Sequence, residues 1–186
     1  MIFTETPLAG AFVIDLELVR DERGFFARTW CQREFEVRGL YARPVQCSVS
    51  FNARAGTVRG LHYQAAPFEE AKIVRCIRGS IFDAIVDLRP GSPTHARHVH
   101  LVLSASNRKV LYVPRGFAHG FQTLEDETEV EYQISEFHQL AYARGVRWND
   151  PAFEIPWPDV PQRIMTERDR TYPDYTPPAN ASLNGD

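Results

Sequence analysis

The chain has 186 residues, of which 44% are hydrophobic and 24% are charged, as in a soluble globular protein with one substantial core. The formal net charge of −3 excludes a global basic field for nucleic acid or anionic membranes. No apolar run approaches the length of a membrane span, and the N-terminal residues lack a signal-peptide pattern. The three cysteines have no CxxC spacing, which favours reduced thiols and a cytoplasmic location.

The first predicted elements are short. Residues 11–18 begin apolar and then alternate, which predicts a β-strand, and residues 25–30 are aromatic-rich, which also favours β-structure. The polar residues 21–24 between them predict a turn. Residues 32–38 are the best candidate for a short helix, and Gly39 is its expected end.

From residue 44 onward the pattern is almost entirely β. Residues 46–52 alternate polar and apolar side chains, so one face of that strand is polar. Further strands, separated by Gly and Pro turns, are predicted at residues 58–63, 71–77, 80–88, 98–103, 109–113, 119–123 and 129–134. Many short strands at regular spacing predict an all-β fold, a jelly-roll β-barrel of the cupin type with a few short helices.

The chain shows no internal repeat and no linker, so residues 1–172 are predicted to form a single domain. After Gly145 the sequence is rich in Trp and Pro, and we expect it to wrap the barrel in irregular structure. Residues 173–186 contain several prolines together with Asn, Ser and Gly. This composition predicts a flexible C-terminal tail.

Three basic side chains stand in segments that otherwise predict buried strands: Arg59, His62 and Lys72. Burying such groups without partners is unfavourable, so their grouping predicts a ligand pocket inside the barrel. Arg59 and His62 have opposite parity in a regular strand. Both can face inward only if the strand bulges, and Gly60 is the natural place for a bulge.

The histidines are candidate metal ligands. Gly56 with His62, and residues 114–119, resemble the two halves of the cupin signature, but Gln64 stands where metal-binding cupins carry a second histidine. Glutamine is a poor ligand for a transition metal, so we expect no metal here. The pair His98 and His100 has no nearby carboxylate and is predicted to lie on a solvated outer face.

Longer motifs resemble those of the dTDP-4-dehydrorhamnose 3,5-epimerase family, in the same order, from about residue 7 to about residue 172. They are Asp21-x-Arg23-Gly24-x-Phe26, Arg59-Gly60-Leu61-His62-Tyr63-Gln64, Lys72, Gly91-Ser92-Pro93-Thr94, Pro114-x-Gly116-Phe117-Ala118-His119-Gly120-Phe121, Tyr132, Trp148-Asn149-Asp150-Pro151 and Ile155-x-Trp157-Pro158.

The resemblance implies inversion of stereocentres beside a C4 ketone in a nucleotide-linked 4-keto-6-deoxyhexose. Protons at C3 and C5 are acidic because the enolate delocalises onto the ketone oxygen. The reaction therefore needs a base on one face of the sugar, an acid on the other and positive charge near the oxygen. Because nothing is oxidised overall, it requires no cofactor and no metal.

The resemblance also implies roles for individual residues. His62 is the base, Asp169 its carboxylate partner, and Tyr132 the proton donor on the opposite face. Lys72 is implied to stabilise the enolate oxygen and Arg59 to clamp the diphosphate. From the residues alone, a role of Tyr132 as a cross-strand packing partner is a plausible alternative.

A second group of residues is expected to contact the substrate or support the site. The polar face of residues 46–52 predicts a lining for the sugar pocket, and the resemblance implies nucleotide contacts from the N-terminal part of the chain. Asp83, in an apolar strand, is predicted to support the site from behind or to have a purely structural role. The substrate-binding candidates are Arg23, Phe26, Gln46, Ser48, Ser50, His119, His138 and Arg170.

The sequence departs from the family pattern at Arg28, Ser48 and the pair Phe137-His138. The departure at Arg28 affects which nucleobase we expect. The departures at Ser48 and at Phe137-His138 affect which sugar we expect. An epimerase that acts at C3 only or C5 only, on a different nucleotide sugar, is therefore an alternative. So are a metal-dependent cupin enzyme and a non-catalytic sugar-nucleotide-binding cupin. The resemblance implies a homodimer with exchanged N-terminal strands.

Overall fold

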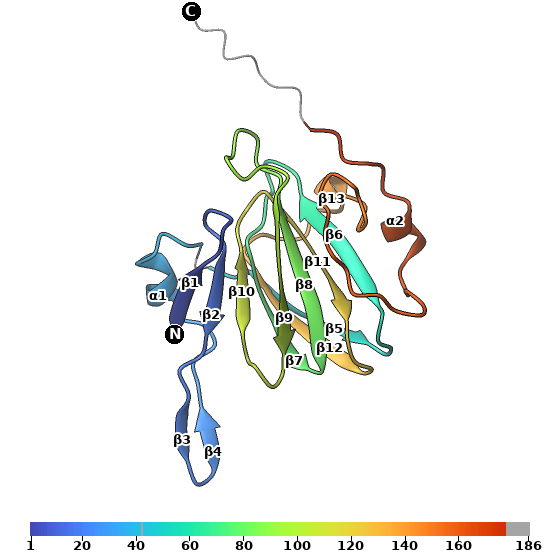
Figure 1. Ribbon diagram of the computed structural model, residues 1–186. Coiled ribbons are helices and arrows are strands. Elements are labelled where there is room, and N and C mark those ends of the chain that lie inside the picture. The colour runs from blue at the N-terminus through green and yellow to red at the C-terminus, as the bar shows by residue number, and fades with distance from the viewer. Residues whose placement is uncertain (42, 178–186) are drawn as a thin grey trace, which may run out of the picture.

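Two antiparallel sheets enclose the core of the protein (Figure 1), whose computed structural model describes residues 1–41 and 43–177. The first sheet, in spatial order, consists of β1 (Ile2–Glu5), β2 (Phe12–Asp15), β10 (Val110–Val113), β7 (Lys72–Arg78), β12 (Thr128–Ile134) and β5 (Gln46–Asn52). The second consists of β13 (Ala143–Gly145), β6 (Val58–Gln64), β11 (Phe117–Thr123), β8 (Ser80–Asp87) and β9 (His98–Ser104). The predicted all-β jelly-roll fold is confirmed.

The main core lies between the two sheets. Val74 and Val130 of the first sheet pack with Ile85 and Phe121 of the second, and all four are almost completely buried. These residues alternate with outward-facing ones along their strands, as the period-2 pattern requires. The inward face of each strand is therefore fixed by hydrophobic burial, and so is the direction of the polar side chains that interrupt it.

The N-terminal region differs in detail from the prediction. Residues 19–26 form a hairpin of β3 (Val19–Asp21) and β4 (Gly24–Phe26), which projects away from the two sheets (Figure 1). The predicted helix is present as α1 (Gln32–Glu36), one turn that buries Phe35 against Phe3 and Tyr112. The pattern missed β1, whose residues are mostly exposed and carry little hydrophobic signal.

Strand β6 carries the bulge that the sequence predicts at Gly60. Its Arg59 pairs with Phe121 and its His62 with His119, so β6 uses one residue more than β11 over this stretch. Gly60 has φ of +118°, and a Cβ there would lie 2.6 Å from the Gly120 Cα. Only glycine fits this close crossing of two backbones. The extra residue allows Arg59 and His62 to share the inner face.

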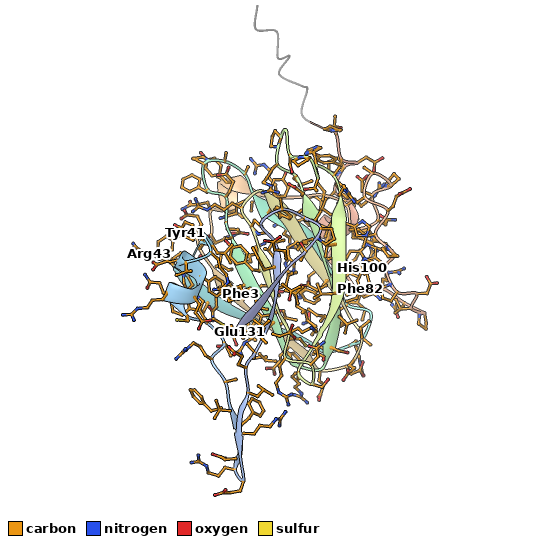
Figure 2. All side chains as sticks on the ribbon, turned by 60° about the vertical axis from the view of Figure 1, so that its left-hand side comes forward. Phe3, Tyr41, Arg43, Phe82, His100 and Glu131 are labelled. Carbon is orange, nitrogen blue, oxygen red and sulfur yellow. The ribbon has the colours of Figure 1, made fainter. Side chains whose placement is uncertain are left out.

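The C-terminal region covers the outer face of the second sheet. Phe153 and Trp157 pack on Leu61 and Phe82, as expected for the Trp- and Pro-rich segment. Figure 2 shows Phe82 beside His100, and their rings stack with centroids 4.8 Å apart. The 3-10 helix η1 (Leu140–Tyr142) precedes β13, and α2 (Glu167–Arg170) follows the wrap and lies beside β6 (Figure 1).

Residues 173–177, the first part of the predicted flexible tail, are described by the structure. The Tyr175 backbone N–H donates to Asp150 at 2.5 Å, and the Tyr175 hydroxyl lies 2.9 Å from His95 Nε2. The remainder of the predicted tail, residues 178–186, lies outside the described residues. Within the part of the chain that is described, no helix has the length and apolar character needed to cross a membrane.

Asp87 at the end of β8 organises the following loop, and we predict a large effect of its replacement on stability. Its fully buried carboxylate accepts hydrogen bonds from Arg89, Ser92 and Thr94 at 2.6–2.9 Å. Burial alone would raise the pKa of Asp87, but the hydrogen bonds outweigh burial and hold the pKa well below its usual range.

Asp87→Asn is expected to lower the free energy of unfolding at pH 7 by about 2–4 kcal/mol, because buried donors lose a charged acceptor. A carboxyl with a depressed folded-state pKa contributes its stability above the unfolded pKa of ~3.9, and loses it as pH falls through the folded pKa. Urea unfolding between pH 7 and pH 3 should therefore show a flatter acid slope in the variant. Asp159→Asn, at an exposed position, is the control, and equal stability of both variants would refute the prediction.

Candidate active site

A cavity of about 540 Å³ opens between the two sheets. Both sheets and the C-terminal segment contribute to its wall. Most of the predicted site residues line it, namely Gln46, Ser48, Ser50, Arg59, His62, Lys72, His119, Tyr132, His138 and Asp169. Residues from five strands and one helix therefore converge on one space, although they are spread over more than half of the chain.

His62 and Asp169 form a hydrogen-bonded pair at the cavity wall. His62 Nε2 lies 2.7 Å from Asp169 Oδ1, and the imidazole is 37% exposed while the carboxylate is 6% exposed. Asp169 comes from α2, where its backbone N–H donates to the Thr166 side chain at 3.2 Å. Helix α2 thus brings a carboxylate to a histidine that is 107 residues earlier in the chain.

The environment of Asp169 keeps it ionised. Burial raises the pKa of Asp169, but the interactions with His62, Gly60 and Thr166 together lower it more, and the pKa lies below its usual value. The Gly60 N–H adds a weak contact at 3.5 Å. An ionised Asp169 accepts the Nε2–H of His62, which leaves the lone pair on Nδ1. This is the arrangement of a general base held by a carboxylate.

Tyr132 reaches the cavity from the opposite sheet. It lies on β12, with its inward-facing neighbour Ser48 directly across on β5. Burial raises the pKa of Tyr132 well above its usual range, and a hydrogen bond with Ser50 offsets only part of this effect. The phenol is therefore protonated at neutral pH. Because His62 and Tyr132 stand on facing sheets, a planar ligand between them would meet a base on one side and an acid on the other.

Lys72 is buried, as its strand pattern predicts, but it is not an isolated charge. Its Nζ lies 2.9 Å from Glu70 Oε1 and donates to the His62 carbonyl oxygen at 3.3 Å. Both side chains of the ion pair are about 10% exposed or less. Glu70, which lies in the turn before β7, thus balances the charge of Lys72. The pair holds the ammonium against the backbone of β6.

Arg59 lies at the open edge of the cavity. Its Nε donates to the buried Asn52 side chain at 2.7 Å, and Nη2 donates to the Phe51 carbonyl oxygen at 3.3 Å. These bonds fix the guanidinium on β5 without neutralising its charge. The remaining N–H groups are free to bind an anion in the forked geometry that suits phosphate.

His119 and Asp83 form a second imidazole–carboxylate pair behind the first. Their Nε2 and Oδ1 atoms are 2.6 Å apart, and the side chains are 4% and 0% exposed. His119 is the cross-strand partner of His62, and its ring lies edge-on to Tyr132 with centroids 6.1 Å apart. Asp83 thus orients a histidine that lines the cavity, a position that fits either of the two roles predicted for it.

The polar face of β5 lines the cavity, as predicted. Gln46, Ser48 and Ser50 line the cavity, together with Val49 of the same strand. The Gln46 side-chain oxygen accepts the His138 backbone N–H at 2.6 Å, which ties the loop after β12 to this strand. This wall of the cavity therefore offers amide and hydroxyl groups that can form hydrogen bonds with a polar ligand.

Three of the predicted residues lie elsewhere in this chain. Arg23 and Phe26 are on the exposed β3–β4 hairpin, where Arg23 forms an ion pair with Asp21 at 2.5 Å. Arg170 lines a separate hollow with Trp148 on the outside of the protein. Neither the hairpin residues nor Arg170 line the cavity between the sheets.

Two arginines line the cavity that the sequence analysis did not single out. Arg168 is two positions from Arg170 on α2, and Arg144 is on β13. A helix of four residues is too short for periodicity to show which arginine faces inward. Arg144 lies in a segment whose pattern gave no strand, so no signal marked its direction.

The described residues contain no cluster of three or more His, Cys, Asp or Glu side chains that could hold a metal. His98 and His100 lie on the edge strand β9. His98 Nδ1 donates to the Phe153 carbonyl oxygen at 2.7 Å, and His100 is exposed, with its ring against Phe82. Both imidazoles thus pack on the outer face of the sheet, which is the face predicted for them.

Comparison with known proteins shows close relatives along nearly the whole chain. A family model described as dTDP-4-dehydrorhamnose 3,5-epimerase matches residues 5–176. An enzyme of that name from Methanothermobacter thermautotrophicus is 42% identical over 172 residues, which cover 91% of this chain and 92% of the relative.

Solved structures show the same similarity. A dTDP-4-dehydrorhamnose 3,5-epimerase from Bacillus anthracis, with TDP and PPi bound, has a TM-score of 0.89 and 40% identity over 94% of this chain and 99% of that one. ChmJ from Streptomyces bikiniensis, a 3'-monoepimerase in complex with dTDP-quinovose, has a TM-score of 0.84 and 28% identity, covering 91% and 85%.

Proposed function

The chain belongs to the dTDP-4-dehydrorhamnose 3,5-epimerase family, and we propose that it inverts C3, C5 or both in a dTDP-linked 4-keto-6-deoxyhexose, in deoxysugar or rhamnose-type biosynthesis. The observation that carries this proposal is the His62–Asp169 pair facing Tyr132 across one cavity. A base and an acid on opposite sides are what inversion of a carbon next to a ketone requires.

The reaction follows from this geometry. His62 Nδ1 takes the proton from the carbon beside the ketone, and the electron pair of the broken C–H bond delocalises onto the ketone oxygen. Lys72 stabilises the resulting enolate charge. Tyr132 then gives its hydroxyl proton to the other face of the carbon, the ketone is restored, and solvent reprotonates Tyr132 while His62 releases its proton. No electrons are transferred overall, so the chemistry needs no redox cofactor.

The cations at the cavity edge suit the nucleotide. Arg59 and Arg168 line the cavity with guanidinium groups that form no ion pair among the described residues, and a diphosphate is the complementary ligand. The TDP bound to the B. anthracis relative and the dTDP-quinovose bound to ChmJ support a dTDP-linked substrate.

We also infer that two copies of the chain assemble. The outer face of β7 and β5 exposes Ile77 and Phe51, which are 39% and 53% accessible. The nearby hairpin exposes Phe26 (73%) and Arg23 (84%). A homodimer that places each hairpin on its partner would cover this apolar face and bring Phe26 and Arg23 to a nucleotide. Sedimentation velocity should give twice the chain mass of 21.3 kDa.

The compartment is inferred from the cysteines. Cys31, Cys47 and Cys76 are all free thiols. Free thiols persist in a reducing environment, so we expect the protein in the cytoplasm. Fractionation of expressing cells would place it there or refute this expectation.

The test of the function is NMR of dTDP-4-keto-6-deoxyglucose incubated with the protein in deuterated water. Deuterium at C3 and C5 with inversion at both carbons would establish a 3,5-epimerase. Exchange with inversion at one carbon would establish the second candidate, which the similarity to a 3'-monoepimerase favours. Absence of any exchange would refute catalysis and leave a binding protein. A stoichiometric metal that is required for activity would establish a metal-dependent cupin enzyme instead.

A further inference from the structure

The catalytic carboxylate is carried by a segment that belongs to neither sheet. Asp169 lies on α2, a helix of four residues, and the chain on either side is largely irregular. Tyr172, three residues later, anchors the same segment, because its ring lies against the β13–β6 pair. A Cβ added to Gly145 would meet the ring of Tyr172 at 2.2 Å. The Tyr172 ring can therefore occupy this position only because residue 145 is glycine.

Tyr172 also touches the catalytic histidine. Gly145 is the cross-strand partner of His62, so a ring packed on Gly145 stands next to the imidazole. The two rings meet edge to face, with centroids 6.2 Å apart and planes at 73°. An edge-to-face neighbour restricts rotation of the partly exposed His62 ring, and so supports the orientation that places Nε2 on Asp169.

The Tyr172 hydroxyl holds a second group of the site. It accepts a hydrogen bond from Arg168 Nε at 2.6 Å, and the guanidinium carbon lies 5.7 Å from the same ring. Arg168 lines the cavity and is otherwise exposed, with no ion pair in the part of the chain described here. Fixing Nε leaves both terminal nitrogens free to meet an anion at the cavity edge.

We propose that Tyr172 is a positioning residue with two separable effects: its ring orients His62, and its hydroxyl holds Arg168 toward the substrate diphosphate. This inference rests on the proposed function for the first effect. The second effect concerns nucleotide binding alone and stands without turnover.

The test separates the hydroxyl from the ring. Tyr172→Phe keeps the ring and loses only the acceptor, so we expect dTDP to bind roughly three- to tenfold more weakly by calorimetry, the scale of one hydrogen bond. The KM of the nucleotide sugar should rise by the same factor, with kcat within about twofold. Tyr172→Leu also loses the ring, and kcat should fall by about tenfold in addition.

The matched control is Tyr175→Phe, which removes a hydroxyl from the same terminal segment. That hydroxyl binds His95, away from the cavity, so dTDP affinity should not change. Arg168→Ala and the Arg168→Ala/Tyr172→Phe double variant should bind dTDP equally weakly, because the hydroxyl acts through Arg168.

Three results would overturn the proposal. They are wild-type dTDP affinity in Tyr172→Phe, equal weakening in Tyr172→Phe and Tyr175→Phe, and additive losses in the double variant. A wild-type protein that binds dTDP but exchanges no proton would refute the epimerase function, while these dTDP titrations would still decide the role of the Tyr172 hydroxyl.

Discussion

We expect His62→Ala to abolish deuterium exchange at both C3 and C5 of the nucleotide sugar. The cavity contains one imidazole whose carboxylate partner leaves a lone pair for proton abstraction at an accessible position, and that imidazole is His62. His119 cannot replace it, because its side chain is almost completely buried with Asp83. Loss of a positioned general base lowers the rate by roughly 10²- to 10⁴-fold, which takes the NMR signal to background.

The measurement is the time course of deuterium incorporation, read separately at the two carbons. His100→Ala is the matched control, since it removes an exposed imidazole from the edge strand β9 and should keep wild-type rates. His62→Ala should still bind dTDP, because His62 is not required to hold the diphosphate. Normal exchange at either carbon in His62→Ala would show that another group acts as base there.

The strand pattern predicted this part of the site because buried β-structure makes polar exceptions visible. Arg59, His62 and Lys72 stand out in segments that are otherwise apolar, and the structure places all three around one cavity. The parity conflict between Arg59 and His62 even predicted the bulge, because two inward side chains at odd spacing require an extra residue between them.

Other parts of the site depend on contacts that no local pattern encodes. Glu70 belongs to a polar turn in the sequence, yet it folds back to balance Lys72 at 2.9 Å. Asp169 was assigned through family resemblance, since a four-residue helix carries no periodicity, and the same shortness misdirected the choice between Arg168 and Arg170. The Asp169–His62 pair joins residues 107 positions apart, and only the folded chain shows it.

The N-terminal hairpin could not be predicted from the sequence for a different reason. Residues 19–26 make no core in this chain, so a prediction based on burial has nothing to fix their strands. Arg23 and Phe26 are exposed on this hairpin. Within one chain they do not line the cavity, so they cannot make the substrate contacts expected for them. If the proposed dimer forms, the burial that explains these residues is supplied by the partner, which a single-chain pattern does not contain.

The second large effect is expected for Tyr132→Phe, in which proton removal and inversion should separate. The variant keeps the ring, including its edge-on packing against His119, and loses only the hydroxyl. Burial raises the pKa of Tyr132 and keeps the hydroxyl protonated at neutral pH, which suits it to donate to the enolate from the side opposite His62. His62 still removes the substrate proton in the variant and can return a deuteron only to the same face.

We therefore expect substrate to gain deuterium with retained configuration while inverted product forms roughly 10²- to 10³-fold more slowly, the range for loss of a general acid. Deuterium incorporation into recovered substrate should fall by less than about tenfold, since the base is intact. Tyr142→Phe, in the 3-10 helix outside the cavity wall, controls for loss of a phenol and should behave as wild type. Wild-type product formation in Tyr132→Phe would mean that a different group delivers the proton. Equal loss of exchange and product would mean that Tyr132 acts before the proton is removed, by holding the sugar rather than by protonating it.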